Sequence, residues 1–494
     1  MKKLCFVLLS AVLFLNLVGC VSAPSPQIPK PPTLEQPVLT PVDIPFQLPV
    51  YPDFPIHPAY AENRSNLVIG SLLYEPLFSL DKQFQAQPVL CRDSSVSEDG
   101  LVWTLQLQEN VFFSDGTALS GEAVADALNL IRKESHHYAQ RLSGIRSITG
   151  DEMAVIITLT QPNAFLPTLL DIPIALGSDL FAPGTGGYVL AREEDGWTLA
   201  ARKDWWQDKP LPSQTIPLTF ISKSDDLVFS FDCGDVSLVD VDLTGTNPLG
   251  YSGNYESWDY TTTAMLYLGY NTQSGPCKQV ELRQSIARSI DRESITQVDY
   301  SRHANVALSP LHPDHPLYPK DLEQTLTFAP ELLSQQNLPL TFIVNSENSA
   351  RVAAAQRIAE QLSSAGLNIT LEVLPFEDYS SALKNGQFDL YLAEVILTAD
   401  FDLSALLLPR ESLNFGLWED PDTQQLLQTL RSAPPQQQSD AATALYTHLA
   451  QQVPIAPICF KNNSVLTRWG QLSGLTPIRG NIFYQLENWT INKN

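Results

Sequence analysis

Residues 338–373 read LPLTFIVNSENSARVAAAQRIAEQLSSAGLNITLEV, and this stretch indicates the fold of the second half of the chain. Residues 338–345 form an apolar run that predicts a strand. Residues 351–364 carry apolar side chains at helical spacing and stop before Gly366, which favours a helix end. Residues 367–373 alternate apolar and polar side chains, as a half-buried strand does. The stretch therefore predicts a strand, a helix and a second strand.

The same pattern continues for another twenty residues. EDYSSALKNG (377–386) predicts a short helix that ends at Gly386, and FDLYLAEV (388–395) predicts a third strand. Strands that alternate with helices in this way form a parallel sheet with crossover helices. Ligands of such sheets bind beyond the carboxyl ends of the strands, so we expect a binding residue just after Val395.

A second recognisable unit lies nearer the N-terminus. Residues 101–107 alternate apolar and polar side chains, which predicts a strand. NVFFSDGTALSGEAVADAL (110–128) then predicts a turn at Ser114–Thr117 and a helix capped by Ser120. The body of the protein is therefore predicted to be mixed α/β.

Length and charge restrict the kind of protein. A chain of 494 residues is too long for one ordinary core, so we expect two or three domains. Its formal charge of −24 excludes nucleic acid as a partner, because phosphate binding needs positive charge.

The N-terminal segment predicts export and a lipid anchor. MKKLCFVLLSAVLFLNLVGC (1–20) has a basic start, a short apolar run and the sequence LVGC, which matches a bacterial lipobox with Cys20 as the lipidated residue. More than one acyl chain on Cys20 would hold the protein stably at a membrane. The alternative is an ordinary anchor helix with a chance cysteine. Residues 21–58 contain 12 of the 37 prolines and predict an extended linker, either a semi-rigid spacer or a disordered leader, with the folded body starting near Ala59.

The remaining cysteines carry no motif. Cys91, Cys233, Cys277 and Cys459 are far apart in the sequence, and no Cys-x-x-Cys pair supports a zinc or redox site. Outside the cell they can pair in three ways, and the sequence does not choose among these. We expect buried free thiols.

Two patterns suggest other chemistry, but both have simpler interpretations. Ser381 and Lys384 form a Ser-x-x-Lys sequence without the companion motifs of serine acylases, so an amphipathic surface helix is the better interpretation. His303, His312 and His315 lie near Asp314 and have the composition of a transition-metal site. Because prolines surround them, a solvated loop is the simpler interpretation. We expect no catalytic residue, no metal site and no cofactor.

Several motifs, taken in order, resemble one family. They are LYEPLFSL (73–80), SEDGLVWTLQLQENVFFSDGTALSGEAVADAL (97–128), PGTGGYVL (183–190), ARKDWWQDKP (201–210), ELRQSIARSIDRESI (281–295) and VPIAPICF (453–460). Their order is similar to that in extracellular solute-binding proteins of family 5, the peptide- and nickel-type binding proteins of ABC importers. The resemblance covers nearly all of residues 60–494.

The resemblance implies an α/β, bilobed periplasmic-binding-protein-like fold of type II, cluster C, with an extra small α/β domain. The implied parts are lobe I (59–75, 180–269 and 465–494), the small domain (76–179) and lobe II (270–464). Asp115 and Gly116 would form a structural turn of the small domain, and Phe112 and Phe113 would both join its core. Two lobes that close on a ligand suit a binding protein, because the ligand shifts the equilibrium towards closure.

The family also implies a ligand anchor. In its peptide-binding members an aspartate just after the last strand of the parallel unit pairs with the peptide ammonium group. Asp400 takes that position here, with Asp402 close behind, which agrees with the strand-end argument above. Tyr270 and Asn271 are further pocket candidates, and Asp400 has the alternative role of capping a turn.

Two departures from the family affect the expected ligand. Leu397 stands where many peptide binders have tryptophan, and no arginine precedes Arg351 to hold a dipeptide carboxylate. We therefore expect an oligopeptide or a non-peptide solute such as a metal chelate. We expect a monomer on the extracytoplasmic face of a bacterial membrane, with an ABC permease and ATPase as partners. Peptide sensing and chaperone activity are the alternative roles for the same fold.

Overall fold

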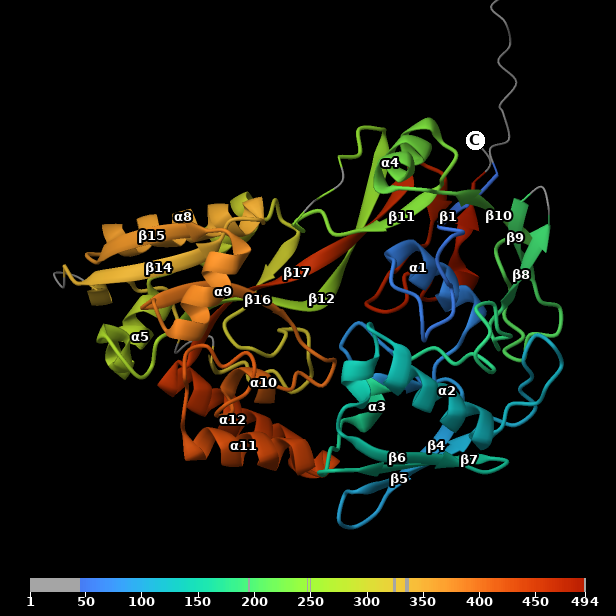
Figure 1. The fold of residues 1–494 in the computed structure, drawn as a ribbon, viewed down its shortest axis with the longest axis horizontal. Helices are drawn as coiled ribbons and strands as arrows, with labels where there is room; N and C mark the ends of the chain where they lie inside the picture. The colour runs from blue at the N-terminus through green and yellow to red at the C-terminus, as the bar shows by residue number, and fades with distance from the viewer. Residues whose placement is uncertain are drawn as a thin grey trace, which may run out of the picture. The chain divides into compact units, whose positions relative to one another are not determined.

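The computed structural model describes residues 45–193, 196–246, 248, 250–322, 326–333 and 337–492 (Figure 1). The predicted signal peptide, Cys20 and linker residues 21–44 lie outside the described residues. Within the described part, no helix is long and apolar enough to cross a membrane.

The predicted strand–helix unit is confirmed. Strand β14 (Pro339–Asn345) pairs in parallel with both β15 (Asn368–Leu374) and β16 (Leu390–Ile396). Helices α8 (Ser349–Ser364) and α9 (Phe376–Asn385) connect them, and α9 ends at Gly386 in the left-handed conformation. Alternate residues of β14 pack into two different cores, one shared with α8 and the other with α9. The two helices therefore cover opposite faces of the sheet, because successive strand side chains point to opposite sides.

This unit continues into a larger sheet. Seven of the described strands belong to it, including β11 (Leu238–Val241), β12 (Tyr255–Tyr270), β13 (Ala304–Val306) and β17 (Ile455–Arg468). The pairing of the long strands β12 and β17 is interrupted between Thr261 and Met265. There Thr262 Oγ1 donates to the carbonyl of Lys461, and Thr263 Oγ1 donates to the carbonyl of Leu397. At this interruption, side-chain hydrogen bonds thus take the place of some backbone hydrogen bonds of the sheet.

Several further helices belong to the second half of the chain. They are α5 (Val280–Arg288), α6 (Arg292–Ser294), α10 (Ser404–Leu407), α11 (Pro421–Ser432) and α12 (Gln438–Gln452). Figure 1 shows α10, α11 and α12 below the large sheet. Helices α11 and α12 pack on each other, and their buried side chains join the core that contains α9.

The predicted N-terminal unit is an antiparallel sheet covered by a helix. Its strand order is β4 (Cys91–Val96), β5 (Val102–Leu107), β7 (Ala154–Leu159) and β6 (Ile145–Gly150). Helix α2 (Gly121–Glu134) packs on it, and the Ser120 hydroxyl accepts from the Ala123 N–H, which confirms the predicted cap. The prediction for the Phe pair is half wrong: Phe113 is buried, but Phe112 is 44% exposed. Neighbouring residues of an extended chain face opposite sides, so only one reaches the core.

The folded part begins earlier than predicted. Strand β1 (Leu48–Val50) is fully buried and pairs in parallel with β10 (Thr215–Phe220), in a sheet that continues through β9 (Gly196–Ala201) and β8 (Tyr188–Glu193). The prolines of residues 45–58 are compatible with this strand because β1 is at the sheet edge, where a missing N–H is tolerated. Helices α1 (Arg64–Leu73) and α4 (Ser224–Cys233) lie in the same region.

Short elements complete the described fold. They are β2 (Phe78–Leu80), β3 (Ala86–Pro88), α3 (Leu166–Leu169), β18 (Leu472–Ser473) and β19 (Thr490–Ile491). All four cysteines of the described part are free thiols. Cys91, Cys277 and Cys459 are buried as expected, whereas Cys233, the last residue of α4, is exposed.

Candidate ligand-binding site

Asp400 lies four residues beyond the end of β16 and is half-buried. Its Oδ1 accepts a hydrogen bond from the Thr398 hydroxyl, and its Oδ2 accepts one from the Asn163 side-chain amide at 3.3 Å. Asn163 is itself buried and fixed, because its Oδ1 accepts from the Phe165 N–H at 2.9 Å. A residue of the β7–α3 connection thus reaches the carboxylate predicted from the second half of the sequence.

The environment of Asp400 opposes its charge. Burial raises the pKa of the Asp400 carboxyl, and the neighbouring Asp402 raises it further, while Thr398, Arg431 and Asn163 lower it in part. A carboxylate whose pKa is raised by burial gains from an added cation, because an opposite charge favours the ionised form. An ammonium group beside Asp400 would provide that charge.

Asp400 faces a cavity of about 310 Å³, here called the Asp400 cavity. Its walls come from residues 140–169 and residues 395–431. The walls include Gln140, Arg141, Gln161, Asn163, Leu169, Ile396, Leu397, Thr398, Asp402, Leu413 and Arg431. The volume lies at the lower end of the range for small-molecule sites.

Two further predicted residues also line this cavity. Asp402 accepts from both the N–H and the hydroxyl of Ser404, the first residue of α10, and it lies 3.8 Å from Arg431 Nη1. Leu397 is buried, and its N–H donates to the carbonyl of Thr263. Leu397 thus forms an apolar part of the cavity wall. It stands where many peptide binders have the larger tryptophan.

Tyr270 and Asn271 are not brought to the Asp400 cavity. Tyr270 is fully buried in the core beneath α5 and α8. Asn271 is buried and uses its side-chain amide to hold the carbonyls of Gly386 and Phe388. Both residues have structural contacts at the end of β12.

A second cavity of about 380 Å³, here called the central cavity, adjoins the first. Arg141 and Ile396 line both. Other residues of the central cavity include Glu62, Arg64, Ser71, His137, Tyr138, Asp240, Asp242, Tyr260, Thr262, Thr263, Glu394, Asn463, Arg479, Gly480 and Ile482. Ile396 is 75% exposed, so the cavities meet at an apolar side chain that nothing in the described chain covers. Such a surface favours contact with a ligand.

Ion pairs form one wall of the central cavity. Lys461 is 2% exposed, and its Nζ lies 2.8 Å from Asp242 and 3.4 Å from Glu394. Arg351 Nη2 lies 3.3 Å from the same Glu394 oxygen. These pairs connect β17, β16 and α8 with the segment after β11, so they fix the wall beside the paired strands β12 and β17.

Most charged residues of the central cavity could not be predicted from the sequence. Arg64, Arg141, Asp240 and Arg479 come from four distant segments and belong to no common motif.

The serine-acylase pattern and the transition-metal pattern seen in the sequence have little geometric support. Ser381 and Lys384 are both exposed on α9. His303 Nδ1 lies 2.8 Å from an oxygen of Asp259, whereas His312 and His315 are buried against Phe84 and Phe401, respectively. Burial lowers the pKa of both histidines to about 4. Among the described residues, no group of three His, Cys, Asp or Glu side chains is placed to hold a metal ion.

A mixed α/β fold with a strand-end cavity and two long crossing strands is that of a type II, cluster C solute-binding protein. Residues 85–409 match the family model of the bacterial extracellular solute-binding proteins, family 5 Middle, and the chain belongs to this family. It is therefore an extracellular solute-binding protein and not an enzyme. This outcome confirms the fold and the class expected from the motifs.

Relatives with known names show the range of the family. The glutathione-binding protein GsiB of Escherichia coli K12 is 24% identical over 341 residues, which are 63% of this chain and 66% of GsiB, or about two thirds of its length. The periplasmic murein tripeptide-binding protein MppA, in an unliganded open form, has a TM-score of 0.75 at 18% identity and covers 91% of this chain and 97% of its own. The ABC transporter substrate-binding protein CtaP of Listeria monocytogenes has a TM-score of 0.70 at 19% identity, with coverage of 90% and 99%.

Proposed function

We propose that this protein is the lipid-anchored solute-binding component of an ABC importer and that it binds peptides, oligopeptides in particular. The observation that carries this proposal is Asp400, a half-buried carboxylate with a raised pKa in a cavity at the end of β16. A peptide ammonium group is the cation of matching chemistry. The names of GsiB and MppA, a glutathione binder and a murein tripeptide binder, support a peptide-like ligand.

We propose that the ligand is enclosed by two lobes divided as the family implies, with lobe I starting at residue 46 instead of 59. The small domain is then 76–179 and lobe II is 270–464. The hinge is the interruption of the β12–β17 ladder at Thr261–Met265, where fewer backbone bonds resist bending. A ligand that touches both sides favours the closed form, and the permease and ATPase respond to closure.

The lipid anchor on Cys20 and the importer are part of the same proposal. Diacylglycerol on Cys20 would keep the binding protein at the membrane that holds the transporter. The residues between Cys20 and β1 would act as the tether. A monomer is sufficient for this role.

Native mass spectrometry of the chain from Val21 onwards, purified without refolding, tests the ligand. A ligand present at 100 times its dissociation constant stabilises a fold by about 2.7 kcal/mol, so a tight ligand survives purification. We expect a ladder of peptide masses. Asp400→Ala should lose it, because truncating one partner of a desolvated charge pair costs about 2–5 kcal/mol.

The control is Asp53→Ala, which removes an exposed carboxylate outside both cavities. It should retain the ladder. A single non-peptide mass bound to the unaltered protein would show that the ligand is another solute. A ladder of peptide masses that persists in Asp400→Ala would show that Asp400 is not the anchor.

A further inference from the structure

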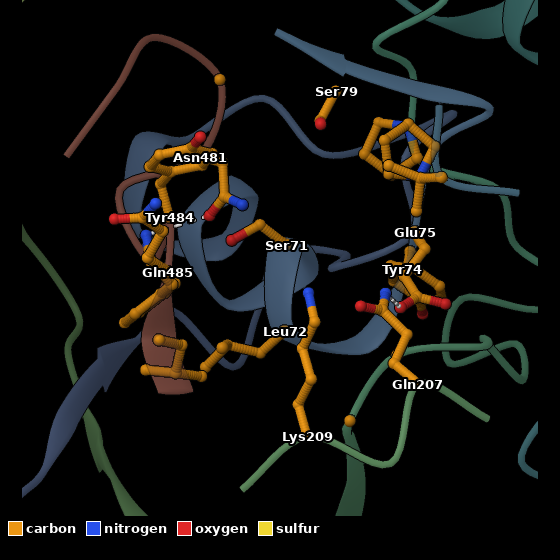
Figure 2. Close-up of a pocket in the computed structure, with 18 of the residues that line it drawn as sticks. Ser71, Leu72, Tyr74, Glu75, Ser79, Gln207, Lys209, Asn481, Tyr484 and Gln485 are labelled. Carbon is orange, nitrogen blue, oxygen red and sulfur yellow. Dashed lines mark hydrogen bonds between the residues drawn. The ribbon is translucent and has the colours of Figure 1, made fainter. Parts of the chain in front are cut away.

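A third cavity, of about 360 Å³, continues from the central cavity into the region of α1 and the C-terminal segment (Figure 2). Ser71, Arg479 and Gly480 line both the central cavity and this third one. Figure 2 shows Ser71 and Leu72 on α1, with Tyr484 and Gln485 beside them on the C-terminal segment. The three cavities thus form a series through shared residues, from Asp400 past Ile396 to Arg479.

Arg479, at the second junction, has an incompletely matched charge. Its side chain is 16% exposed, and its Nη1 is buried without a hydrogen-bond partner in the described part of the chain. The nearest anion is Asp171, whose Oδ2 lies 3.7 Å from Nη1. Asp171 already accepts a hydrogen bond from Arg141 through its other carboxylate oxygen. Two guanidinium groups therefore share one carboxylate.

The other charges of this region do not compensate Arg479. Arg64 lies 3.6 Å from Asp240, which pairs with no other cation in the described part of the chain, and Asp242 and Glu394 pair with Lys461. Burial and Arg141 lower the pKa of Arg479 to about 10, which leaves it charged at neutral pH.

The nearby His137 is affected by the same guanidinium groups. Burial, together with Arg141, Arg479 and Arg64, lowers the pKa of its imidazole to about 4. His137 is therefore neutral at physiological pH and adds no cation of its own. The guanidinium groups are the charged donors that an anion would meet at this junction.

We propose that Arg479 binds the C-terminal carboxylate of the ligand whose ammonium group binds Asp400. The bound class is then linear peptides with both ends free, long enough to pass Ile396 and cross the central cavity. A guanidinium group matches a carboxylate in shape, and the pair is stronger in a desolvated site than in water. The third cavity gives space for the side chain of the last residue. This inference rests on the proposed peptide-binding function and adds a second anchor to it.

The test compares tri-, tetra- and penta-alanine with their C-terminal amides by isothermal titration calorimetry on the chain from Val21 onwards. For the length that binds most tightly, the free acid should bind at least about 30-fold more tightly than its amide, as expected for a desolvated charge pair. In Arg479→Met the acid and the amide should differ by less than about threefold. Arg479→Lys should keep part of the preference, because it retains the charge but loses the fork geometry. Arg357→Met is the matched control, since Arg357 already pairs with Asp299 and lines none of the three cavities, and it should keep the full preference.

The acid–amide comparison in the unaltered protein needs no variant, so misfolding of Arg479→Met cannot obscure the result. Equal binding of acid and amide overturns the Arg479 anchor. If peptides are nevertheless retained in an Asp400-dependent way, the peptide-binding function stands. If folded Arg479→Met still preferred the free acid to the amide in full, the carboxylate would bind elsewhere. That result would also overturn the inference. Absence of all peptide binding, together with a non-peptide mass on the purified protein, overturns both proposals.

Discussion

Glu75 and Asp400 are two carboxylates that are at least half-buried in different regions of the molecule, and they have different hydrogen-bond partners. Glu75 accepts hydrogen bonds from the indole N–H groups of Trp205 and Trp206 at 3.1 and 2.7 Å and from the amide of Gln207 at 2.6 Å. Asp400 accepts from one hydroxyl and, at 3.3 Å, from one amide, and its near neighbour Asp402 is another acid.

Burial raises the pKa of both carboxyl groups, but hydrogen bonds offset that cost to different extents. The donors of Glu75 come from three consecutive residues and occupy both of its oxygens. A buried charge surrounded by fixed donors holds structure together, whereas one with few donors and a cavity beside it is available to a ligand. Glu75 is therefore predicted to serve stability, and Asp400 is predicted to serve binding.

The largest stability effect is expected for Glu75→Ala. It leaves three donors without their acceptor, of which Trp205 and Gln207 line the third cavity, and each unpaired buried group costs about 1–3 kcal/mol. Water that enters the space will recover part of this, so we expect the free energy of unfolding to fall by about 3 kcal/mol, measured by urea denaturation. Glu98→Ala, on an exposed turn, is the control and should change little. Unchanged stability with loss of bound peptide would reverse the assignment and make Glu75 a ligand residue.

A smaller loss is expected for Trp206→Phe. The substitution keeps an aromatic ring but removes one donor to a charged acceptor, which costs about 1.5–3 kcal/mol of unfolding free energy. Trp103→Phe is a matched control, because the Trp103 indole N–H is buried without a partner in the described chain. Removing that donor should be close to neutral. Equal destabilisation by the two substitutions, in thermal unfolding followed by calorimetry, would show that ring volume matters more than the Glu75 hydrogen bond.

Sequence periodicity was sufficient for the elements around Asp400 because the relevant signals are local. The alternation of residues 367–373 and the helical spacing of 351–364 reflect burial on one face, and they predicted β15 and α8 correctly. The region just after β16 followed from topology, since ligands bind beyond the carboxyl ends of parallel strands, and the resemblance to family 5 then singled out Asp400.

The partners of Asp400 and Arg479 were not predictable in the same way. Asn163 is 237 positions away from Asp400 in the sequence, and Asp171 is 308 positions away from Arg479, so no local pattern relates them. Strand β1 was missed because proline-rich composition predicts an extended linker, and only pairing with β10 reveals a sheet edge. Tertiary contacts of this kind decide which polar residues form the site.

Asp400→Asn should stabilise the unliganded protein while abolishing ammonium binding. The folded-state pKa of Asp400 is raised above the usual 3.8, so the folded state favours the protonated, neutral form. Its favourable contribution is complete below about pH 3.8 and is lost as the pH rises through the raised pKa. Asparagine has no charge to bury at neutral pH. We therefore expect the free energy of unfolding of the unliganded protein to rise by about 1 kcal/mol at pH 7, as is common where a binding residue limits stability.

Thermal melts of unliganded Asp400→Asn and unaltered protein across pH 3.5 to 8 test this sign. The gap between their melting temperatures should be small at the acid end and widen towards neutral pH. A gap that narrows with rising pH would mean that Asp400 is already well compensated, and the contrast with Glu75 would disappear. Glu98→Gln should show no pH-dependent gap, because Glu98 is exposed.

Asp259 extends the comparison to a carboxylate near the surface, and here the smallest effect is expected. It accepts from the hydroxyls of Ser257 and Ser464 and pairs with His303 Nδ1 at 2.8 Å. The hydrogen bond to Asp259 raises the pKa of His303.

The stabilisation from this pair is therefore complete below the usual histidine pKa of 6.5 and is lost as the pH rises through the raised value. His303→Gln should cost less than about 1 kcal/mol of unfolding free energy at pH 6, because solvent screens pairs at this depth, and still less at pH 9. His136→Gln, at a histidine that is 86% exposed, should cost nothing at either pH. If His303→Gln and Glu75→Ala lowered the unfolding free energy equally, burial would not matter. The number of donors alone would then set how much a carboxylate stabilises this fold.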